Sequence, residues 1–367
     1  MENTLHKRHL SKLGVWALSF GCSVGWGAFI MPGTTFLPIA GPLGTLLGLI
    51  IGAIIMVLIG MNYSYMMNRF RDDGGPITYT KRILGHDHAF LNAWFLLLTY
   101  IAIIWANASA LTLIIRVLFG SALQFGYLYT IAGFEIYIGE LLIPIFSLIV
   151  FGLICVSKKK IASLIQIIMA ILLFLGIGSI LIICLVNNKG AINTFKPAFA
   201  EGKNGFASIF AMVALAPWAF IGFESVSQST GEFKFNVKKS IWVIASAIVT
   251  SALSYIFLSI VATTSVPDGY TNWFDYISNL PTSGISMYPI FNAVNDAIGN
   301  TGIIILSITA FMGISTGLLG NYIAASRVIR TMAEDDMLPK WFKKTNKEDN
   351  PTHALYLLIA ICVIIQF

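Results

Sequence analysis

The sequence has little charge. Asp, Glu, Lys and Arg make up only 11% of its 367 residues, whereas soluble globular domains carry about 25%. A soluble domain of this length would lack the polar groups to cover its surface, so that class is excluded. Hydrophobic residues make up 57% of the chain, and the mean hydropathy is +0.80. The composition predicts a polytopic membrane protein.

Cysteine and histidine are also scarce. The five histidines lie at the ends of apolar segments, and only one carboxylate, that of Glu224, lies deep within an apolar run. An enzyme site needs several converging acids, bases or nucleophiles, so we expect no enzyme and no cofactor. Scattered cysteines within apolar runs favour packing over a disulfide framework or a metal site. The four cysteines are Cys22, Cys155, Cys184 and Cys362.

Long apolar runs dominate the chain. Crossing about 30 Å of hydrocarbon takes roughly 20 helical residues. Eight runs meet this length, at residues 13–37, 42–68, 89–118, 134–156, 161–187, 206–231, 239–264 and 301–330. A ninth begins near Ala354 and is still apolar at Phe367, so we expect the sequence to be truncated within helix 9.

Positive charge is distributed unevenly between the segments that connect these runs. Lys and Arg near membrane ends are retained in the cytoplasm. With the amino terminus inside, 19 of the 23 basic residues are cytoplasmic, and only Arg116, Lys189, Lys196 and Lys203 are outside. This asymmetry predicts a multi-pass plasma-membrane protein, in contact with lipid, with a cytoplasmic amino terminus. Because topology explains the net charge of +6, no nucleic-acid partner is expected.

Small and helix-breaking residues interrupt two of the predicted spans. Backbone that leaves helical geometry at membrane depth must be shielded by protein and given polar partners. Paired interruptions are typical of secondary transporters, although small residues also serve close helix packing. The first interruption comprises Ser23, Val24, Gly25, Trp26 and Gly27, and the second comprises Pro217, Trp218, Ala219, Phe220, Ile221 and Gly222.

The second interruption comes five spans after the first, so its helix enters the membrane from the opposite side. The pattern predicts an all-α polytopic membrane protein with a five-plus-five inverted-repeat fold and discontinuous helices 1 and 6. The first repeat would cover residues 1–187. An extracellular connection, 188–205, would lead to the second, incomplete repeat at 206–367.

An interrupted helix exposes unpaired backbone groups. Its free N–H groups attract a carboxylate, and its free C=O groups attract an ammonium group or a cation. A zwitterionic amino acid carries both charges. The glycines at positions 25 and 27 allow close approach of a ligand to the backbone. We therefore expect Ser23, Gly25 and Gly27 to meet the carboxylate, and residues 218–222 to meet the ammonium group and the side chain.

Three ordered motifs resemble those of amino acid permeases in the amino acid-polyamine-organocation superfamily. They are residues 21–33 (GCSVGWGAFIMPG), residues 217–225 (PWAFIGFES) and residues 333–339 (AEDDMLP). Gly74-Gly75-Pro76 also fits that family. The resemblance implies amino acid transport by alternating access, as proton-coupled symport or exchange. Trp26 departs from the family, which more often has a small residue between these glycines.

The resemblance also implies roles for single residues. Trp218 matches an aromatic residue that stacks on the substrate and gates the outward path, although an interfacial anchor is the alternative. Glu224 lies in a medium of low dielectric constant and can exchange a proton as its access to water changes, so it is expected to couple transport to protonation or to set the switch between conformations. A structural hydrogen bond to the broken first helix is the alternative for Glu224. Asn107 matches a polar residue near the substrate, with interhelical hydrogen bonding as its alternative. Tyr322 is expected to line the pathway.

Two rival functions remain at this stage. Ser315 and Thr316 carry hydroxyl oxygens that could hold sodium, which would make the protein a sodium-coupled symporter, although hydroxyl groups in membrane helices usually bond backbone. A transporter-like amino acid sensor is the second rival. The predicted spans contain no deep Lys or Arg that could pair with an anionic substrate. The sequence therefore favours a neutral amino acid.

Overall fold

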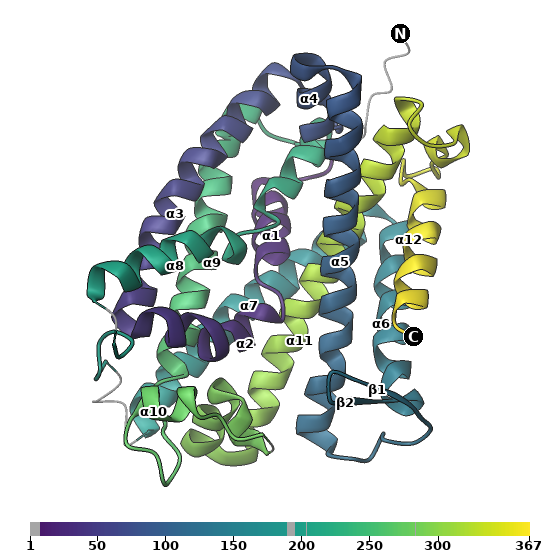
Figure 1. Ribbon diagram of the computed structural model, residues 1–367. Helices are drawn as coiled ribbons and strands as arrows, with labels where there is room; N and C mark the ends of the chain where they lie inside the picture. The colour runs from purple at the N-terminus through teal and green to yellow at the C-terminus, as the bar shows by residue number, and fades with distance from the viewer. Residues whose placement is uncertain (1–7, 189–194, 203, 283) are drawn as a thin grey trace.

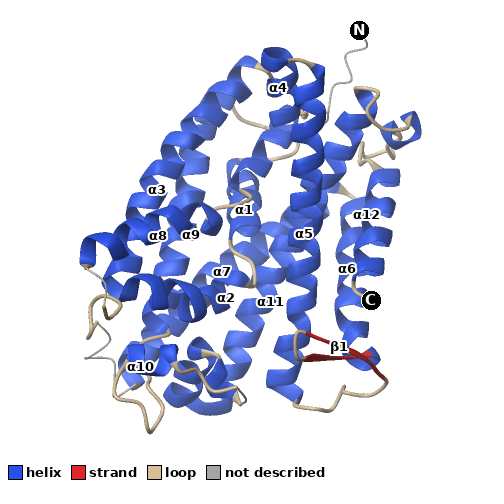
Figure 2. Cartoon of the chain, in the orientation of Figure 1, coloured by secondary structure: helices blue, strands red, loops and turns tan. Residues whose placement is uncertain are grey.

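The computed structural model describes residues 8–188, 195–202, 204–282 and 284–367. Most of these residues are helical, and the only described strands are β1 (Tyr127–Ile131) and β2 (Phe134–Tyr137), which form one antiparallel hairpin (Figures 1 and 2). Seven helical segments of the described chain are long and apolar enough to cross a membrane. A multi-pass membrane protein is therefore confirmed.

The first predicted span is two short helices joined by a break. Helix α1 (Lys12–Ser23) begins with the Ser11 side chain capping the Gly14 N–H and ends where Val24 leaves helical geometry (φ −115°, ψ 84°). Helix α2 (Gly27–Met31) leads through a π-helical turn (Pro32–Phe36) into α3 (Leu37–Arg69). A kink at Gly41, where φ is +69°, separates the first span from the second.

The sixth predicted span is also broken. Helix α8 covers Gly205–Ala219, and a 3₁₀ helix covers Phe223–Glu232. Between them the chain turns at Gly222, whose φ of +106° is a left-handed conformation that glycine adopts without steric cost. The break is shorter than the sequence suggested, because Pro217 and Trp218 are still part of α8.

The remaining helices follow the predicted spans with two differences. The run at 134–156 begins with strand β2 before the helix starts, and the run at 301–330 belongs to a longer helix that is kinked at Ile298 and Gly299. The helices are α4 (Pro76–Leu84), α5 (His86–Phe119), α6 (Ile138–Val156), α7 (Lys159–Asn187), α9 (Ser240–Val261), α10 (Trp273–Ser278), α11 (Pro289–Glu334) and α12 (Thr352–Ile365), with 3₁₀ turns at Val237–Lys239, Ile285–Met287 and Lys340–Lys343.

Helix α1 lies in the centre of the bundle, where it contacts α7, α9 and α11 (Figure 1). Small residues allow the surrounding helices to approach closely. Gly52 of α3 faces Ala216 of α8, and Gly48 faces Met212, so that added Cβ atoms would collide there. These contacts hold α3 beside α8 and bring the two broken segments together.

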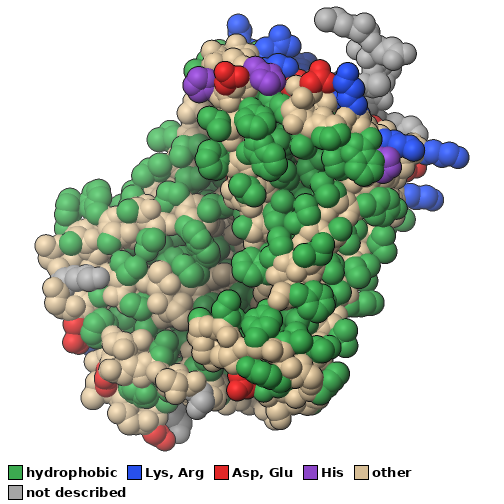
Figure 3. Space-filling model, turned by 45° about the vertical axis from the view of Figure 1, so that its right-hand side comes forward, with side chains coloured by type: hydrophobic (Ala, Val, Ile, Leu, Met, Phe, Trp, Pro, Cys, Tyr) green, Lys and Arg blue, Asp and Glu red, His purple; other side chains and the backbone are tan. Residues whose placement is uncertain are grey.

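Basic side chains gather at one end of the molecule, beside α4 (Figure 3). We call this end the basic face. It carries Arg71, Lys81, Arg82, Lys159, Arg327 and Arg330, which all line one cavity. Lys7, Lys189 and Lys203, which the charge count includes, lie outside the described residues, as does much of the predicted connection 188–205.

Candidate functional site

The two breaks meet in the middle of the bundle. The Ser23 hydroxyl at the end of α1 donates a hydrogen bond to the Phe220 carbonyl at the second break, over 3.3 Å. One turn earlier, the Ser19 hydroxyl donates to the Phe223 carbonyl over 3.4 Å. Gly222 lies against Cys22, where an added Cβ would be 2.8 Å from its carbonyl carbon. Each break therefore supplies polar partners for the other.

Trp218 stands beside the first break. A Cβ added to Gly27 would lie only 2.6 Å from the Cη2 atom of Trp218, so the missing side chain is what lets the indole approach. The Trp218 ring also makes an edge contact with Phe36, with ring centroids 6.5 Å apart. Trp218 is 42% exposed, so the described chain covers only part of it.

Asn107 connects α5 to the first break. The backbone N–H of Trp26 donates to Asn107 Oδ1 over 3.0 Å, and Asn107 Nδ2 donates to the Ile103 carbonyl of its own helix over 3.0 Å. Gly25 and Gly317 flank the amide, and a Cβ on Gly317 would lie 3.2 Å from Nδ2. Asn107 is thus in contact with the residues predicted to receive the carboxylate.

Glu224 closes the second break. Its Oε2 accepts a hydrogen bond of 2.8 Å from the Gly222 N–H, and its Oε1 accepts one of 3.3 Å from the Tyr100 hydroxyl of α5. The Gln228 amide donates to the same Tyr100 oxygen over 3.2 Å. Glu224 therefore satisfies a backbone donor that the break leaves unpaired, and it ends a chain of three hydrogen-bonded side chains.

The sequence did not single out two side chains at this site. The Tyr255 hydroxyl of α9 donates to the Ser23 carbonyl over 3.3 Å. The Gln166 amide of α7 donates to the carbonyls of Ala17 (3.2 Å) and Thr316 (3.1 Å), and so joins α1 to α11. Each is an ordinary polar residue in an apolar run. Only the packing of distant helices gives each side chain its backbone partners.

Ser315 and Thr316, the predicted cation ligands, differ in the hydrogen bonding of their hydroxyl groups. The Thr316 hydroxyl donates to the carbonyls of Met312 and Gly313 in its own helix, over 3.0 and 2.9 Å. The Ser315 hydroxyl is buried and has no hydrogen-bond partner among the described residues. Tyr322 packs on Gly152 of α6, and it does not line the cavity on the basic face.

A cavity of about 770 Å³ opens on the basic face. Its lining extends inward to Leu18 of α1 and Gln166 of α7. Leu18 lies five residues before Ser23, which is about 8 Å along a helix. The lining thus runs from the charged surface to the helix that carries the first break.

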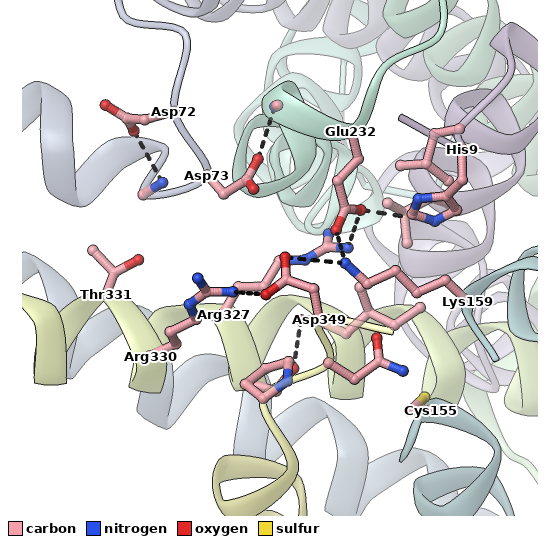
Figure 4. Close-up of a pocket in the computed structure, with 18 of the residues that line it drawn as sticks. His9, Asp72, Asp73, Cys155, Lys159, Glu232, Arg327, Arg330, Thr331 and Asp349 are labelled. Carbon is pink, nitrogen blue, oxygen red and sulfur yellow. Dashed lines mark hydrogen bonds and ion pairs between the residues drawn. The ribbon is translucent and has the colours of Figure 1, made fainter. Parts of the chain in front are cut away.

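A buried carboxylate organises the wall of this cavity (Figure 4). Glu232, at the end of the second broken segment, is 2% exposed. It forms ion pairs of 2.5 Å with Lys159 of α7 and with Arg327 of α11, and it lies 3.8 Å from His9. The Glu232 carboxylate therefore joins four separate parts of the chain at the mouth of the cavity.

The opposite side of the breaks is covered. Trp26 packs on Phe291 at the start of α11, with ring centroids 6.3 Å apart, and Tyr288 packs on Phe291 at 5.9 Å. Trp273 and Tyr276 of α10, in the same connection, are buried, and the Tyr276 hydroxyl donates a hydrogen bond to the Ser286 carbonyl. The connection 265–300 thus packs as short helices on this side.

Comparisons with known proteins agree with this architecture. The amino acid permease family profile matches residues 10–367, and the chain belongs to that family, in the amino acid-polyamine-organocation superfamily. It is 25% identical over 350 residues to a methylthioribose transporter of Bacillus subtilis, covering 92% of this chain and 70% of that one. It is 24% identical over 363 residues to the branched-chain amino acid permease BcaP of Lactococcus lactis, with 95% and 73% covered.

A further relative and a solved structure are also similar to this chain. A vacuolar cationic amino acid transporter 4 of Arabidopsis thaliana is 26% identical over 350 residues, covering 92% of this chain and 54% of the relative. A solved structure of a Na⁺-coupled sialic acid symporter, substrate-bound and outward-open, superimposes with a TM-score of 0.65 at 12% identity, over 98% of this chain and 73% of that one. Family and fold together identify a membrane transport protein rather than an enzyme.

Proposed function

We propose that this protein is a secondary active transporter that moves a neutral amino acid across the plasma membrane by alternating access. The observation that carries the proposal is the meeting of the two breaks, joined by the bond between Ser23 and Phe220. The two broken helices would begin two inverted repeats, residues 1–187 and 206–367. Their pseudo-symmetry would let one group of helices move against the other around a fixed site.

The substrate would lie between the breaks. Backbone N–H groups of residues 23–27 would receive the carboxylate, and carbonyls of residues 218–222 would receive the ammonium group. Trp218 would cover the substrate, since it already packs over Gly27. A neutral side chain suits this position, because Glu224 is already engaged by Gly222 and Tyr100. The names of the relatives span branched-chain and cationic amino acids and methylthioribose, so the side-chain class needs a direct test.

The basic-face cavity would be the cytoplasmic half of the transport route. It leads toward the first break, while Phe291 covers Trp26 on the other side. This arrangement supports a state that is closed outward and accessible from the basic face. The excess of Lys and Arg on that face supports a cytoplasmic orientation for it and for the amino terminus.

Coupling would use protons. Glu224 bonds directly to the second break, so loss or gain of its proton would change the hydrogen bond to Gly222. Sodium at Ser315 and Thr316 is the rival proposal. The hydrogen bonding around Thr316 favours protons, because the Thr316 carbonyl already accepts a hydrogen bond from the Gln166 amide. An amide N–H next to a carbonyl competes with a cation for the same lone pairs.

Uptake by proteoliposomes tests the proposal. The purified protein should accumulate a radiolabelled neutral amino acid when an inward proton gradient is imposed, and replacement of Na⁺ by choline should leave uptake unchanged. Glu224→Gln should keep substrate binding but remove the dependence of uptake on the proton gradient. Binding without any uptake would instead support a sensor. Sodium-dependent uptake that Ser315→Ala abolishes would support the sodium-coupled rival.

A further inference from the structure

Asn107 occupies the position that the proposed function assigns to a substrate carboxylate oxygen. Its Oδ1 accepts the Trp26 N–H over 3.0 Å, inside the first break. The side chain is 8% exposed. Asn107 reaches the break from a different helix, α5, which is separated from α1 and α2 in the sequence by α3 and α4.

The surroundings of Asn107 are shaped to admit it. Gly25 and Gly317 lie on either side of the amide, and a Cβ on either glycine would crowd its atoms. The amide nitrogen is held by the Ile103 carbonyl, which turns the oxygen toward Trp26. The amide orientation therefore follows from two bonds of complementary polarity, with a donor at one end and an acceptor at the other.

We infer that Asn107 is an internal placeholder: it accepts the Trp26 N–H while the site is empty and surrenders that N–H to the carboxylate of the incoming substrate. The inference rests on the proposed function, and it names the substrate class as molecules that carry a carboxylate. A neutral amide oxygen and a carboxylate oxygen are both acceptors for the same donor. The charged acceptor forms a hydrogen bond roughly twice as strong. The substrate carboxylate therefore replaces Asn107 Oδ1 as the acceptor of the Trp26 N–H.

The placeholder has two consequences for the transport cycle. The unliganded break has no unpaired Trp26 donor, which would be costly in a buried site. Ligands without a carboxylate cannot displace Asn107, because they offer no better acceptor. An amine with the same side chain therefore leaves the bond between Trp26 and Asn107 intact.

The test compares L-leucine with 3-methylbutylamine, which is leucine without its carboxylate. Isothermal titration of the purified protein would measure the Kd of both ligands for the wild type, Asn107→Leu and Asn107→Asp. Leucine at position 107 fills a similar volume but removes the acceptor, while aspartate keeps an acceptor and adds a carboxylate that repels the substrate carboxylate when it is ionised. Thr99→Val is the matched control, since the Thr99 hydroxyl is exposed on α5 and bonds only to its own helix.

If Asn107 is a placeholder, the two substitutions at position 107 should change the affinity for L-leucine in opposite directions. Asn107→Leu should bind L-leucine about fivefold more tightly, the equivalent of one typical hydrogen bond, while the unliganded protein melts at a lower temperature. Asn107→Asp should bind L-leucine at least about tenfold more weakly. Neither Asn107→Leu nor Thr99→Val should alter the Kd of 3-methylbutylamine. If Asn107→Leu binds L-leucine and the wild type shows no measurable binding, that result would also support the inference.

Equal or weaker leucine binding by Asn107→Leu would overturn the inference, because a direct ligand or a purely structural cap predicts that result. If the wild type still takes up leucine in that case, only the inference fails. Absence of leucine binding in both proteins overturns the inference and the proposed leucine-like substrate together. Hydrogen exchange at the Trp26 amide gives a readout that needs no ligand: it should be faster in unliganded Asn107→Leu, and unchanged exchange counts against the placeholder.

Discussion

The hydroxyl of Ser23 donates to the carbonyl of Phe220 over 3.3 Å, although 197 residues separate them in the sequence. The same hydroxyl lies 3.0 Å from the Ser19 carbonyl within α1, so it serves the end of one broken helix and the turn of another. This contact fixes how far apart the two breaks can lie.

Removing the Ser23 hydroxyl should loosen the two breaks. Ser23→Ala should destabilise the protein by about 1 kcal/mol, the usual net value of one hydrogen bond, and should weaken substrate binding several-fold because the breaks are no longer aligned. Thermal unfolding and a Kd measurement would check both effects. Ser179→Ala is the control, because the Ser179 hydroxyl is exposed and bonds only within α7. A change in stability without a change in Kd would contradict the alignment role.

Gly222 should not tolerate a side chain. Its φ is +106°, and a Cβ there would lie 2.7 to 2.8 Å from atoms of Cys22. Left-handed strain alone costs roughly 1–2 kcal/mol, so Gly222→Ala should lower stability by about 2 kcal/mol or more and abolish uptake.

The matched control for that change is Gly178→Ala in α7, where an added Cβ meets nothing within 4 Å. Alanine in a helix is favoured over glycine by roughly 0.5–1 kcal/mol, so this variant should be as stable as the wild type or more so. Thermal melting of both variants checks the pair. Equal stability of Gly222→Ala and wild type would show that the second break is not built as described.

Gly27 and Trp218 should behave as a coupled pair. A Cβ at position 27 would lie 2.6 Å from Trp218 Cη2, so Gly27→Ala should push the indole away and reduce uptake. Trp218→Phe shortens the ring and should restore part of the loss in the double variant. A double-mutant cycle on the Kd would measure the coupling, expected within about 0.5–3 kcal/mol for residues in contact. If the effects of the two substitutions on the Kd are additive, Trp218 does not act together with Gly27 of the first break.

Glu232 should be the most sensitive residue on the basic face. Glu232→Gln would leave Lys159 and Arg327 without their buried partner, and breaking a buried ion pair in this way typically costs 3–5 kcal/mol. Asp336→Asn provides the control, since Asp336 forms only exposed pairs with Lys340 (3.7 Å) and Lys343 (3.9 Å), which contribute about 0–1 kcal/mol. Chemical unfolding in detergent would compare the two. A loss below about 1 kcal/mol in Glu232→Gln would contradict the role of the carboxylate as an organising centre.

Much of the fold could be predicted because lipid imposes strong rules. Apolar runs of span length became α5, α7 and α9 with boundaries close to those expected. Gly25 and Gly222 marked the breaks, because helical geometry fails first where backbone is least restricted. The hairpin of β1 and β2 was missed, since β1 is exposed along its whole length and β2 continues without a break into the apolar run of α6.

The site was predictable only in part. Glu224 was singled out as a carboxylate deep within an apolar run, and Trp218 and Asn107 by their match to positions of the family. Each of them lies at a break. Tyr322 packs on Gly152 of α6, and its expected place along the pathway stays a prediction. Helical position alone does not specify which neighbour a side chain meets. Gln166 and Tyr255 gave no local signal, because their partners are backbone carbonyls on other helices.

The sequence by itself determined that this chain crosses a membrane many times and that its first and sixth spans cannot be continuous helices, because hydrophobicity and glycine content act locally. Tertiary structure alone decided that the two breaks touch, that Asn107 accepts from Trp26, and that Glu232 pairs with side chains from three other segments. These contacts depend on how helices pack around α1, and packing is a property of distant residues acting together.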